Sequence, residues 1–411
     1  MASESCYENL LSQTECQHIV ENALEGAILT KYEIVPASSD TIGYLGDYYK
    51  LKTTVLLNGT DSRDISFFVK SLPLRNEVHK AVIRRLQFMD KETTLYNLFH
   101  KMKKYSNYKW HPEVYLCRED VLVLEDLIQS NYKHHKFNLN LPDVLVWPAL
   151  KCLAAMHANS IVYEVKTDTN IGADYVHLFN RTITKGNTWV NSGLKSIYTL
   201  ARMHPKFQTI EYQHFITNSL ATEVEKVHQL GRISEQYRNT LCHRDLWENN
   251  MMFRDDVAGF HCILVDFQVT RYIPPSIDIG LFLHMNTDRT NRKENLTRYF
   301  NYYFDCLTKF TAEMGVNIND QLPRVEFDKT YEEFKLIPLV LTCVYAPIVY
   351  LPDFKILNRI NKEDPVKFQH IMNGDRSDFT IEHINKFKDY GDRVMEAVEE
   401  LTEYLFENRE Q

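Results

Sequence analysis

Apolar and polar residues alternate along one stretch near the N-terminus, residues 49–57. One side of the alternation carries Tyr49, Leu51, Thr53, Val55 and Leu57. This period of two predicts a half-buried strand. Asn58-Gly59 then predicts a turn, and the apolar run 65–69 predicts a partner strand that ends at Lys70. Residues 121–127 predict one further buried strand with an acidic end.

Elsewhere the apolar residues recur at helical spacing. Residues up to about 35 are predicted to be helical, with a stripe of Ile19, Val20, Ala23 and Leu24. Further helices are predicted at 88–99, from Pro142 onward, and at 212–231, 291–310, 331–350 and 381–407. The sequence therefore predicts an α+β fold with a small β-rich N-terminal lobe at 1–127 and a larger, mostly helical C-terminal lobe at 128–411.

Composition and charge narrow the class of protein. The chain has 411 residues and a formal net charge of -8, which disfavours a nucleic-acid partner. Its eight cysteines are scattered without metal-binding spacing, as in an intracellular protein. The N-terminus lacks a signal peptide pattern, and the most apolar segment, 336–351, contains two prolines and is too short for a membrane span. We therefore expect a cytoplasmic protein with no membrane span.

One motif near the middle of the chain carries catalytic chemistry. The sequence LCHRDLWENNMMF, residues 241–253, places Asp245 five positions before Asn250. An aspartate on a tight loop can accept the proton of an attacking hydroxyl, and the asparagine can offer a neutral oxygen to Mg²⁺. The next strand ends in ILVDFQ and delivers Asp266, a second predicted magnesium ligand. Together these residues have the layout of a phosphotransferase catalytic loop.

Two residues of the N-terminal part fit the same chemistry. Lys70 ends a strand, and Glu92 lies on the helix predicted at 88–99. A strand lysine paired with a helix glutamate is how a kinase aims an ammonium at the α- and β-phosphates of ATP. Upstream, Gly43 and Gly46 could form a turn that covers the phosphates, although the stretch is not G-x-G-x-x-G and an ordinary hairpin turn explains it as well.

The strand at 121–127 is where a connector between kinase lobes would lie. Its backbone at Glu125 and Leu127 is a candidate for contact with the adenine edge, with a plain core strand as the alternative. His157, on the helix that begins near Pro142, is interpreted as a core histidine.

The spacing after Asp266 distinguishes between kinase types. Asp278 follows Asp266 by twelve positions, and no A-P-E motif follows. This leaves no room for the activation segment of a protein kinase, so we expect a small molecule as the acceptor. Asp278 itself is predicted to be a helix cap or a brace for the catalytic loop.

With these residues in place, the chain resembles the ecdysteroid kinase-like family of arthropods, which is related to choline kinases and aminoglycoside phosphotransferases. The resemblance rests on FFVKSLP, FMDKETTLY, LVLEDL, LAAMHANS, CHRDLWENNMMF, VDFQ and DIGLFL. It implies a two-lobed protein-kinase-like fold, dependence on ATP and Mg²⁺, and phosphorylation of a hydroxyl on an ecdysteroid, another steroid or a xenobiotic conjugate. Two features depart from the family: Arg244 stands where the family usually has glycine, and the glycine-rich loop is poorly matched.

The resemblance also implies residue roles. Asp245 is the expected catalytic base, and Asn250 and Asp266 are the expected magnesium ligands. Lys70 is expected to position the phosphates, with Glu92 as its partner.

Two other functions stay open at this point: a catalytically idle kinase-like carrier or sensor of a lipophilic ligand, and a choline- or sugar-type kinase. The sequence gives no prediction of the oligomeric state or of the acceptor pocket.

Overall fold

The computed structural model describes residues 7, 9–37, 46–74, 80, 84, 87–106, 108–135, 139–179, 184–257, 259–353 and 355–409. The chain divides into two compact units, Met1–His135 with Asn250–Val269 and Lys136–Asn249 with Thr270–Gln411. The first unit thus includes a segment that follows the predicted lobe boundary at residue 127. The lobe boundaries stay a prediction.

The first unit begins with a short helix, α1 (Gln13–Ala23), and not with the longer helix predicted up to residue 35. Ser12 and Glu15 form a capping box at its start. Gly26, with φ of 76°, follows the helix, and Ile28–Pro36 forms strand β1. Residues 31–34 alternate in exposure, with Ile34 buried, so the period-two pattern was present and was misread as helical.

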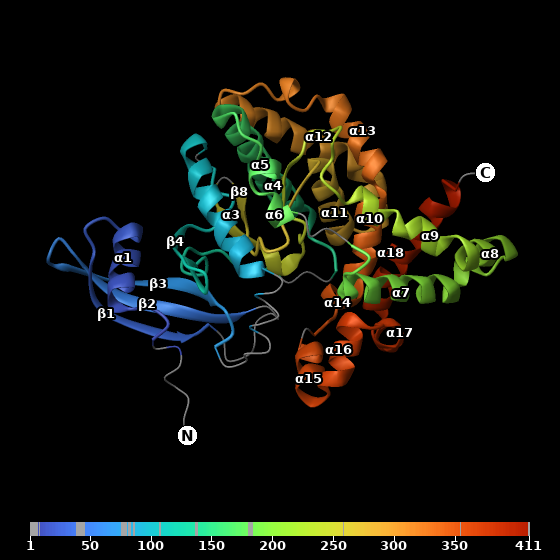
Figure 1. Cartoon of the computed structure of the whole chain (residues 1–411), viewed down its shortest axis with the longest axis horizontal. Helices are drawn as coiled ribbons and strands as arrows, with labels where there is room; N and C mark the ends of the chain where they lie inside the picture. The colour runs from blue at the N-terminus through green and yellow to red at the C-terminus, as the bar shows by residue number, and fades with distance from the viewer. Residues whose placement is uncertain are drawn as a thin grey trace. The chain divides into compact units, whose positions relative to one another are not determined.

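A five-stranded antiparallel sheet forms the centre of this unit (Figure 1). Its strands are β1, β2 (Asp47–Leu57), β3 (Asp61–Ser71), β4 (Val114–Cys117) and β5 (Val121–Glu125), in the order β1-β2-β3-β5-β4. The predicted turn is confirmed: Asn58 and Gly59 both have positive φ, at 49° and 76°, and join β2 to β3. The predicted alternation along β2 is confirmed as well, because Leu51 and Val55 are buried.

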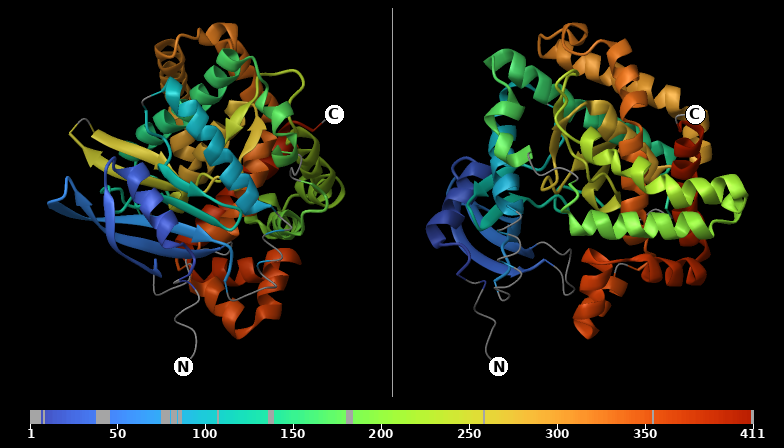
Figure 2. Two further views of the ribbon diagram at one scale, coloured as in Figure 1. Left: turned by 60° about the vertical axis from the view of Figure 1, so that its left-hand side comes forward. Right: turned by 45° about the vertical axis from the view of Figure 1, so that its right-hand side comes forward.

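The two faces of the sheet have different roles. One face packs its apolar residues against Ile19 and Val20 of α1, which lies over the sheet in Figures 1 and 2. Phe67 and Val69 of β3 belong to this core, so the alternate residues of β3, including Lys70, lie on the opposite face. Beyond β3 the chain forms helix α3 (Phe88–Met102), as predicted, and the short turn η1 (Lys103–Tyr105). The hairpin β7 (Met251–Asp256) and β8 (Gly259–Leu264) completes the unit.

The second unit is mostly helical. Its helices before the catalytic loop are α4 (Asp143–Thr167), α5 (Ile171–Asp174), α6 (Val176–Phe179), α7 (Thr188–Met203), η2 (Pro205–Phe207), α8 (Ile210–Asn218), α9 (Leu220–Glu225) and α10 (Val227–Leu230). Strand β6 (Thr240–Cys242) precedes the segment 250–269 in the chain, strand β9 (Arg271–Ile273) follows it, and the two strands pair with each other. The short helix η3 (Glu248–Asn250) follows the catalytic loop. The remaining helices are α11 (Pro275–Asn286), α12 (Arg289–Glu313), η4 (Ile318–Asp320), α13 (Arg324–Phe334), α14 (Leu336–Val349), α15 (Lys355–Glu363), α16 (Pro365–Asn373), α17 (Ser377–Lys386) and α18 (Lys388–Glu407).

Three of the predicted helices are interrupted. The helix predicted at 212–231 is three helices, α8 to α10. The one predicted at 331–350 ends at Phe334 and restarts at Leu336. Pro338 explains this break, since its ring nitrogen cannot donate a hydrogen bond to a preceding helical carbonyl and is tolerated only in a first turn. The last predicted helix is split at Phe387, whose backbone is extended.

Helix α4 is the one helix among the described residues that is long and apolar enough to cross a membrane by length and composition. The most apolar part of α4 is 83% buried inside the structure, as in a core helix. The predicted α+β fold class is confirmed, with a β-rich N-terminal part and a mostly helical C-terminal part.

Candidate active site

Lys70 is buried on the face of the sheet opposite α1 and forms ion pairs with two carboxylates. Its Nζ lies 2.6 Å from Oε2 of Glu92 and 3.1 Å from Oδ1 of Asp266. The side chain of Lys70 is only 6% exposed. The structure thus brings together three residues that the sequence placed at separate points, and all three lie in the first unit.

Glu92 reaches Lys70 from the buried face of α3. Its second oxygen accepts a hydrogen bond from the backbone N–H of Phe267 at 3.3 Å, so one carboxylate contacts both Lys70 and the residue after Asp266. The rings of Tyr96 and Phe99, on the same helix, pack against the ring of Phe267 and so hold the residue that follows Asp266. The helix therefore positions the ion pair through both charge and packing.

The electrostatics of this cluster favour a bound cation. Burial lowers the pKa of Lys70, but Asp266 and Glu92 raise it by more, so the ammonium pKa lies well above its ordinary value. Burial raises the pKa of Glu92, and this outweighs the opposing effect of Lys70. Two carboxylates face one ammonium, which leaves one negative charge uncompensated when all three are ionised.

Asp266 and Asn250 lie at the same end of the β7–β8 hairpin. Asn250 immediately precedes β7, and its carbonyl accepts the N–H of Val265 at 3.0 Å. Asp266 follows Val265 with φ of 67°, a left-handed turn out of the strand. Its Oδ2 accepts a hydrogen bond from Nε2 of Gln268 at 3.1 Å. A carboxylate and an amide oxygen at one end of a hairpin are hard oxygen donors, so the residue types fit Mg²⁺.

Of the four remaining nucleotide-site predictions, Gly46, Glu125 and Leu127 lie in or near the sheet of the first unit. Gly43 falls outside the described residues. Gly46 precedes β2, and a Cβ added there would lie 2.9 Å from the backbone oxygen of Ser71, so this position has no room for a side chain.

Glu125 and Leu127 lie at the end of β5. The Glu125 carboxylate pairs with Lys109 at 2.6 Å and therefore has a structural partner. The carbonyl of Leu127 accepts the N–H of Tyr132 at 2.8 Å in the turn that follows. Their contact with adenine stays a prediction.

In the second unit, Asp245 lies on the loop after β6 and is half-buried. The preceding residue, Arg244, has φ of 71°, a left-handed conformation that favours glycine. This is the position where the resembling family usually has glycine. The loop geometry that presents Asp245 thus survives here with an arginine, which the structure must hold in a strained conformation.

The carboxylate of Asp278 holds this loop by accepting two of its backbone N–H groups. Its Oδ2 accepts the backbone N–H of His243 at 2.7 Å, and its Oδ1 accepts that of Arg244 at 2.9 Å. Asp278 lies inside the first turn of α11, where Pro274 occupies the cap position, so the prediction of a helix cap is wrong and the prediction of a brace is confirmed.

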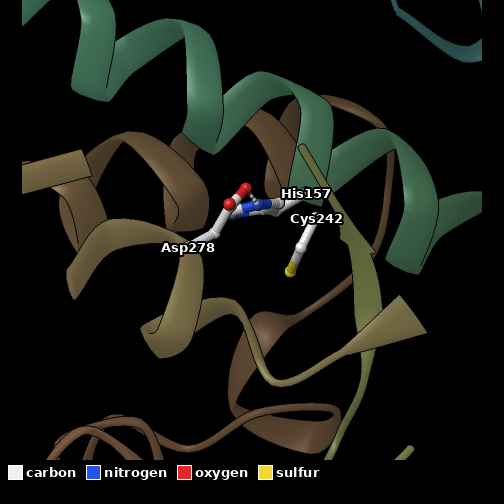
Figure 3. Close-up of side chains that lie close together, drawn as sticks. All are labelled: His157, Cys242 and Asp278. Atoms are coloured by element: carbon white, nitrogen blue, oxygen red, sulfur yellow. Dashed lines mark hydrogen bonds and ion pairs between the residues drawn. The ribbon is translucent and has the colours of Figure 1, made fainter. Parts of the chain in front are cut away.

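His157 completes the brace, and Figure 3 shows its ring beside the Asp278 carboxylate. His157 is fully buried, as predicted for a core histidine. Its Nε2 lies 3.3 Å from Oδ2 of Asp278, and its Nδ1 lies 2.7 Å from the hydroxyl of Tyr303. Burial raises the pKa of Asp278, but the hydrogen bond and charge of His157, with the charge of His243 and the backbone N–H of Arg244, lower it below its ordinary value.

The same histidine and aspartate lie close to Cys242, and the three donor atoms fall within 4.8 Å of one another. Both carboxylate oxygens already accept backbone N–H groups, and the Cys242 thiol donates to the carbonyl of Ile273 at 3.3 Å. Burial raises the pKa of Cys242 well above its ordinary value, whereas a metal ligand must be a thiolate. The cluster is therefore a hydrogen-bonded support for the loop.

Sequence reasoning missed Tyr345 on α14, whose hydroxyl feels the charges of Asp245, Arg244 and Arg271. Neither Tyr345 nor Arg271 on β9 belongs to a recognisable motif. The one available signal was Arg244 in place of glycine.

The sequence matches the family model of the ecdysteroid kinase-like family over residues 42–316, about two thirds of the chain. This range contains every predicted site residue and supports the predicted enzyme class, a phosphotransferase with a hydroxyl acceptor. No curated protein is significantly similar in sequence.

Solved structures of several small-molecule kinases are similar to this chain. One is an aminoglycoside phosphotransferase with streptomycin and ATP: 15% identity, 88% of this chain, 99% of that chain and a TM-score of 0.37. An ethanolamine kinase of Plasmodium vivax has 13% identity and a TM-score of 0.35, and the match covers 83% of this chain and 88% of that chain. A microcompartment-associated aminopropanol kinase has 11% identity and a TM-score of 0.41, and the match covers 95% of this chain and 97% of that chain.

Proposed function

We propose that this chain, which belongs to the ecdysteroid kinase-like family, transfers the γ-phosphoryl group of ATP to a hydroxyl of a small molecule. The acceptor class we propose is an ecdysteroid or a related steroid or xenobiotic. The observation that carries the proposal is the buried ion-pair cluster of Lys70 with Glu92 and Asp266. Lys70 and Glu92 are buried and Asp266 is partly exposed. Burying an ion pair is costly, and a cluster of this kind is expected where an ammonium must be held for phosphate binding.

Each residue has a role in this proposal. Lys70, held by Glu92, binds the α- and β-phosphates. Asp245 accepts the proton of the acceptor hydroxyl as that oxygen attacks the γ-phosphorus. Asn250 and Asp266 would hold Mg²⁺, and the bound ion would neutralise phosphate charge.

The transfer forms a bond between the acceptor oxygen and the γ-phosphorus and breaks the bond to the bridging oxygen, so ADP leaves. Asp245 is suited to act as the base because Asp278 fixes its loop through two backbone N–H groups. Most of the rate would come from positioning and charge neutralisation. We further propose that the protein acts in the cytoplasm.

The carrier or sensor hypothesis is less well supported. A protein that only holds a lipophilic ligand has no need for a buried lysine with two acidic partners. A choline- or sugar-type kinase would share the chemistry and differ in the acceptor, so the same assay separates it.

The test is transfer of labelled phosphate from ATP, with Mg²⁺, to a panel of ecdysteroids, other hydroxylated steroids and choline. Asp245→Asn is expected to lower kcat by at least about 100-fold, because general base catalysis typically contributes that much. Its ATP affinity should stay within about threefold, since the half-buried carboxylate that loses its charge is not assigned to the nucleotide. Asp255→Asn, the same change at an exposed position on β7, is the matched control and should behave like the wild type.

Turnover by Asp245→Asn at the wild-type rate would end the assignment of the base. Transfer to choline alone would favour the choline-type kinase. Failure of the wild type to bind ATP in a thermal-shift titration, together with binding of a steroid, would favour the carrier.

A further inference from the structure

Helix α11 is hydrogen-bonded to the catalytic loop near both of its ends. In its first turn, Asp278 accepts two backbone N–H groups that precede Asp245 in the loop. At its last residue, Asn286, the side-chain nitrogen Nδ2 donates a hydrogen bond to the carbonyl of Leu246 at 2.6 Å. Leu246 directly follows Asp245. One helix therefore holds the loop on both sides of the expected catalytic base.

The C-terminal end of α11 is itself firmly held. All 12 residues of the helix, Pro275–Asn286, are buried. The last carbonyls of a helix have no partner within it, and here other segments of the second unit supply the donors. The carbonyl of Asn286 accepts the N–H of Leu141 at 2.7 Å, and the carbonyl of Met285 accepts the hydroxyl of Tyr350 at 2.6 Å. The residue that bonds the loop is thus fixed in position.

The side-chain amide of Asn286 is shared between the helix and the loop. Besides its bond to Leu246, its Nδ2 donates to the carbonyl of Phe282, one turn earlier in α11, at 2.8 Å. An amide NH₂ group has two N–H donors, so one serves the helix and the other serves the loop. These carbonyls also fix the orientation of the amide, because an oxygen in place of Nδ2 would face two acceptors. Asn286 is only 4% exposed, so both bonds are formed away from water.

The loop between the two attachment points contains a strained residue. Arg244 has φ of 71°, a conformation that favours glycine. Such a conformation persists only where the surrounding structure holds it. Asp278 fixes the loop before Asp245, whereas Asn286 fixes it after Asp245. If the second attachment were lost, relaxation at Arg244 would move the carboxylate of Asp245.

We propose that Asn286 is a positioning residue for Asp245. It holds the carbonyl of Leu246 and so keeps the base in place, without contact to a substrate of its own. This inference rests on the proposed function, where Asp245 is assigned as the base. A base must lie within hydrogen-bond reach of the proton that it accepts, and a displacement of about 1 Å can lower a rate about 100-fold.

The experiment replaces Asn286 with leucine, which has a similar branched shape and no donor. We expect Asn286→Leu to lower kcat for phosphate transfer at least about 10-fold per folded molecule, with KM for ATP and for the acceptor changed less than about twofold. Asn218→Leu is the matched control. Asn218 is likewise the last residue of its helix, α8, and donates to the carbonyl of His214 one turn earlier at 2.9 Å, but it is exposed. Its kcat should equal that of the wild type.

Asn286→Thr is a milder second variant that separates the two bonds of the amide. A threonine hydroxyl in a helix commonly donates to the carbonyl one turn earlier, as that of the neighbouring Thr287 does to Leu283 at 2.7 Å. Its single donor would then keep the bond to Phe282 and lose the bond to the loop. We therefore expect kcat of Asn286→Thr to fall at least about 10-fold as well.

Hydrogen exchange measures the hold on the loop without any catalysis. The peptide 241–250 contains both N–H groups that Asp278 accepts. In the protein without ligands, we expect its amides to exchange at least about 10-fold faster in Asn286→Leu and Asn286→Thr than in the wild type, because a loop with fewer attachments opens more often. Asn218→Leu should exchange like the wild type.

Unchanged exchange of the loop in both Asn286 variants would overturn the inference, and so would a wild-type kcat in Asn286→Leu. If Asn286→Leu does not fold, Asn286→Thr carries the test. Recovery of the wild-type kcat in Asn286→Thr would assign Asn286 to its own helix and would equally overturn its role toward the loop. Failure of the wild type to transfer phosphate to any acceptor would count against the proposed function, and the exchange rates would still decide whether Asn286 holds the loop.

Discussion

Replacing Asp278 with asparagine tests how the catalytic loop is held. Asp278 is fully buried, and its two oxygens accept the N–H groups of His243 and Arg244 at 2.7 and 2.9 Å. Asparagine has one oxygen, so its NH₂ group would face one of these donors. One buried N–H is then left unsatisfied, which costs about 1–3 kcal/mol, and the other bond loses its charge, which costs about 1 kcal/mol. We expect Asp278→Asn to lower the free energy of unfolding by about 2–4 kcal/mol.

The measurement is urea denaturation followed by circular dichroism, with the change taken from the transition midpoint at constant slope. Asp288→Asn is the matched control. Asp288 caps α12 by accepting the N–H of Asn291 at 2.7 Å, and asparagine caps helices about as well, so we expect a loss of only a few tenths of a kcal/mol.

The stability difference between the wild type and Asp278→Asn is expected to depend on pH. The pKa of Asp278 in the folded protein lies below its ordinary value. The carboxylate therefore stabilises the fold above the unfolded pKa of about 3.9, and this contribution is lost as the pH falls through the folded pKa. The gap between the wild type and Asp278→Asn should be constant from pH 7 to roughly pH 5 and should shrink below about pH 4.

A loss of less than about 0.5 kcal/mol in Asp278→Asn would refute the brace, because surface substitutions commonly fall in that range. So would an equal loss in Asp288→Asn, or a gap that does not shrink in acid.

The remaining predictions concern the first unit. Lys70→Met leaves the buried carboxylate of Glu92 without its counter-charge, so we expect a loss of about 3–5 kcal/mol in thermal or urea unfolding, partly recovered in Lys70→Met/Glu92→Leu. A double variant no more stable than Lys70→Met would show that the unpaired carboxylate of Glu92 does not cause the loss of stability. Gly46→Ala places a Cβ 2.9 Å from the backbone oxygen of Ser71, and we expect a loss of about 1–3 kcal/mol. Gly186→Ala, where the nearest atom is 3.9 Å away, should be within about 0.5 kcal/mol of the wild type, and equal effects would refute the steric reasoning.

The sequence predicted the parts of the site that depend on local pattern. Period-two alternation located β2, and the apolar run 65–69 located β3 with Lys70 near its end. Helical spacing located α3 and therefore Glu92. Motif spacing singled out Asp245, Asn250 and Asp266, whose roles stay predictions. These predictions were possible because the pattern that favours a strand, helix or loop lies within a few consecutive residues.

Element boundaries were less predictable, for a physical reason. The strand β1 is stabilised by pairing with β2, and its register with residues about twenty positions later is absent from its own pattern. The splits in the helices of the second unit likewise occur inside continuous apolar patterns, where only a residue such as Pro338 leaves a mark in the sequence.

Contacts between distant segments were decided by the tertiary structure alone. Asp278 braces the N–H of His243 from 35 residues away, and Lys70 meets Asp266 across 196 residues. Each contact depends on which faces of a helix, strand and loop pack together, and burial then sets the strength of its charges and hydrogen bonds. The sequence by itself determined the chemical groups of the site; only the fold decided which of them are buried together, because burial and charge pairing arise from packing between segments that are remote in the chain.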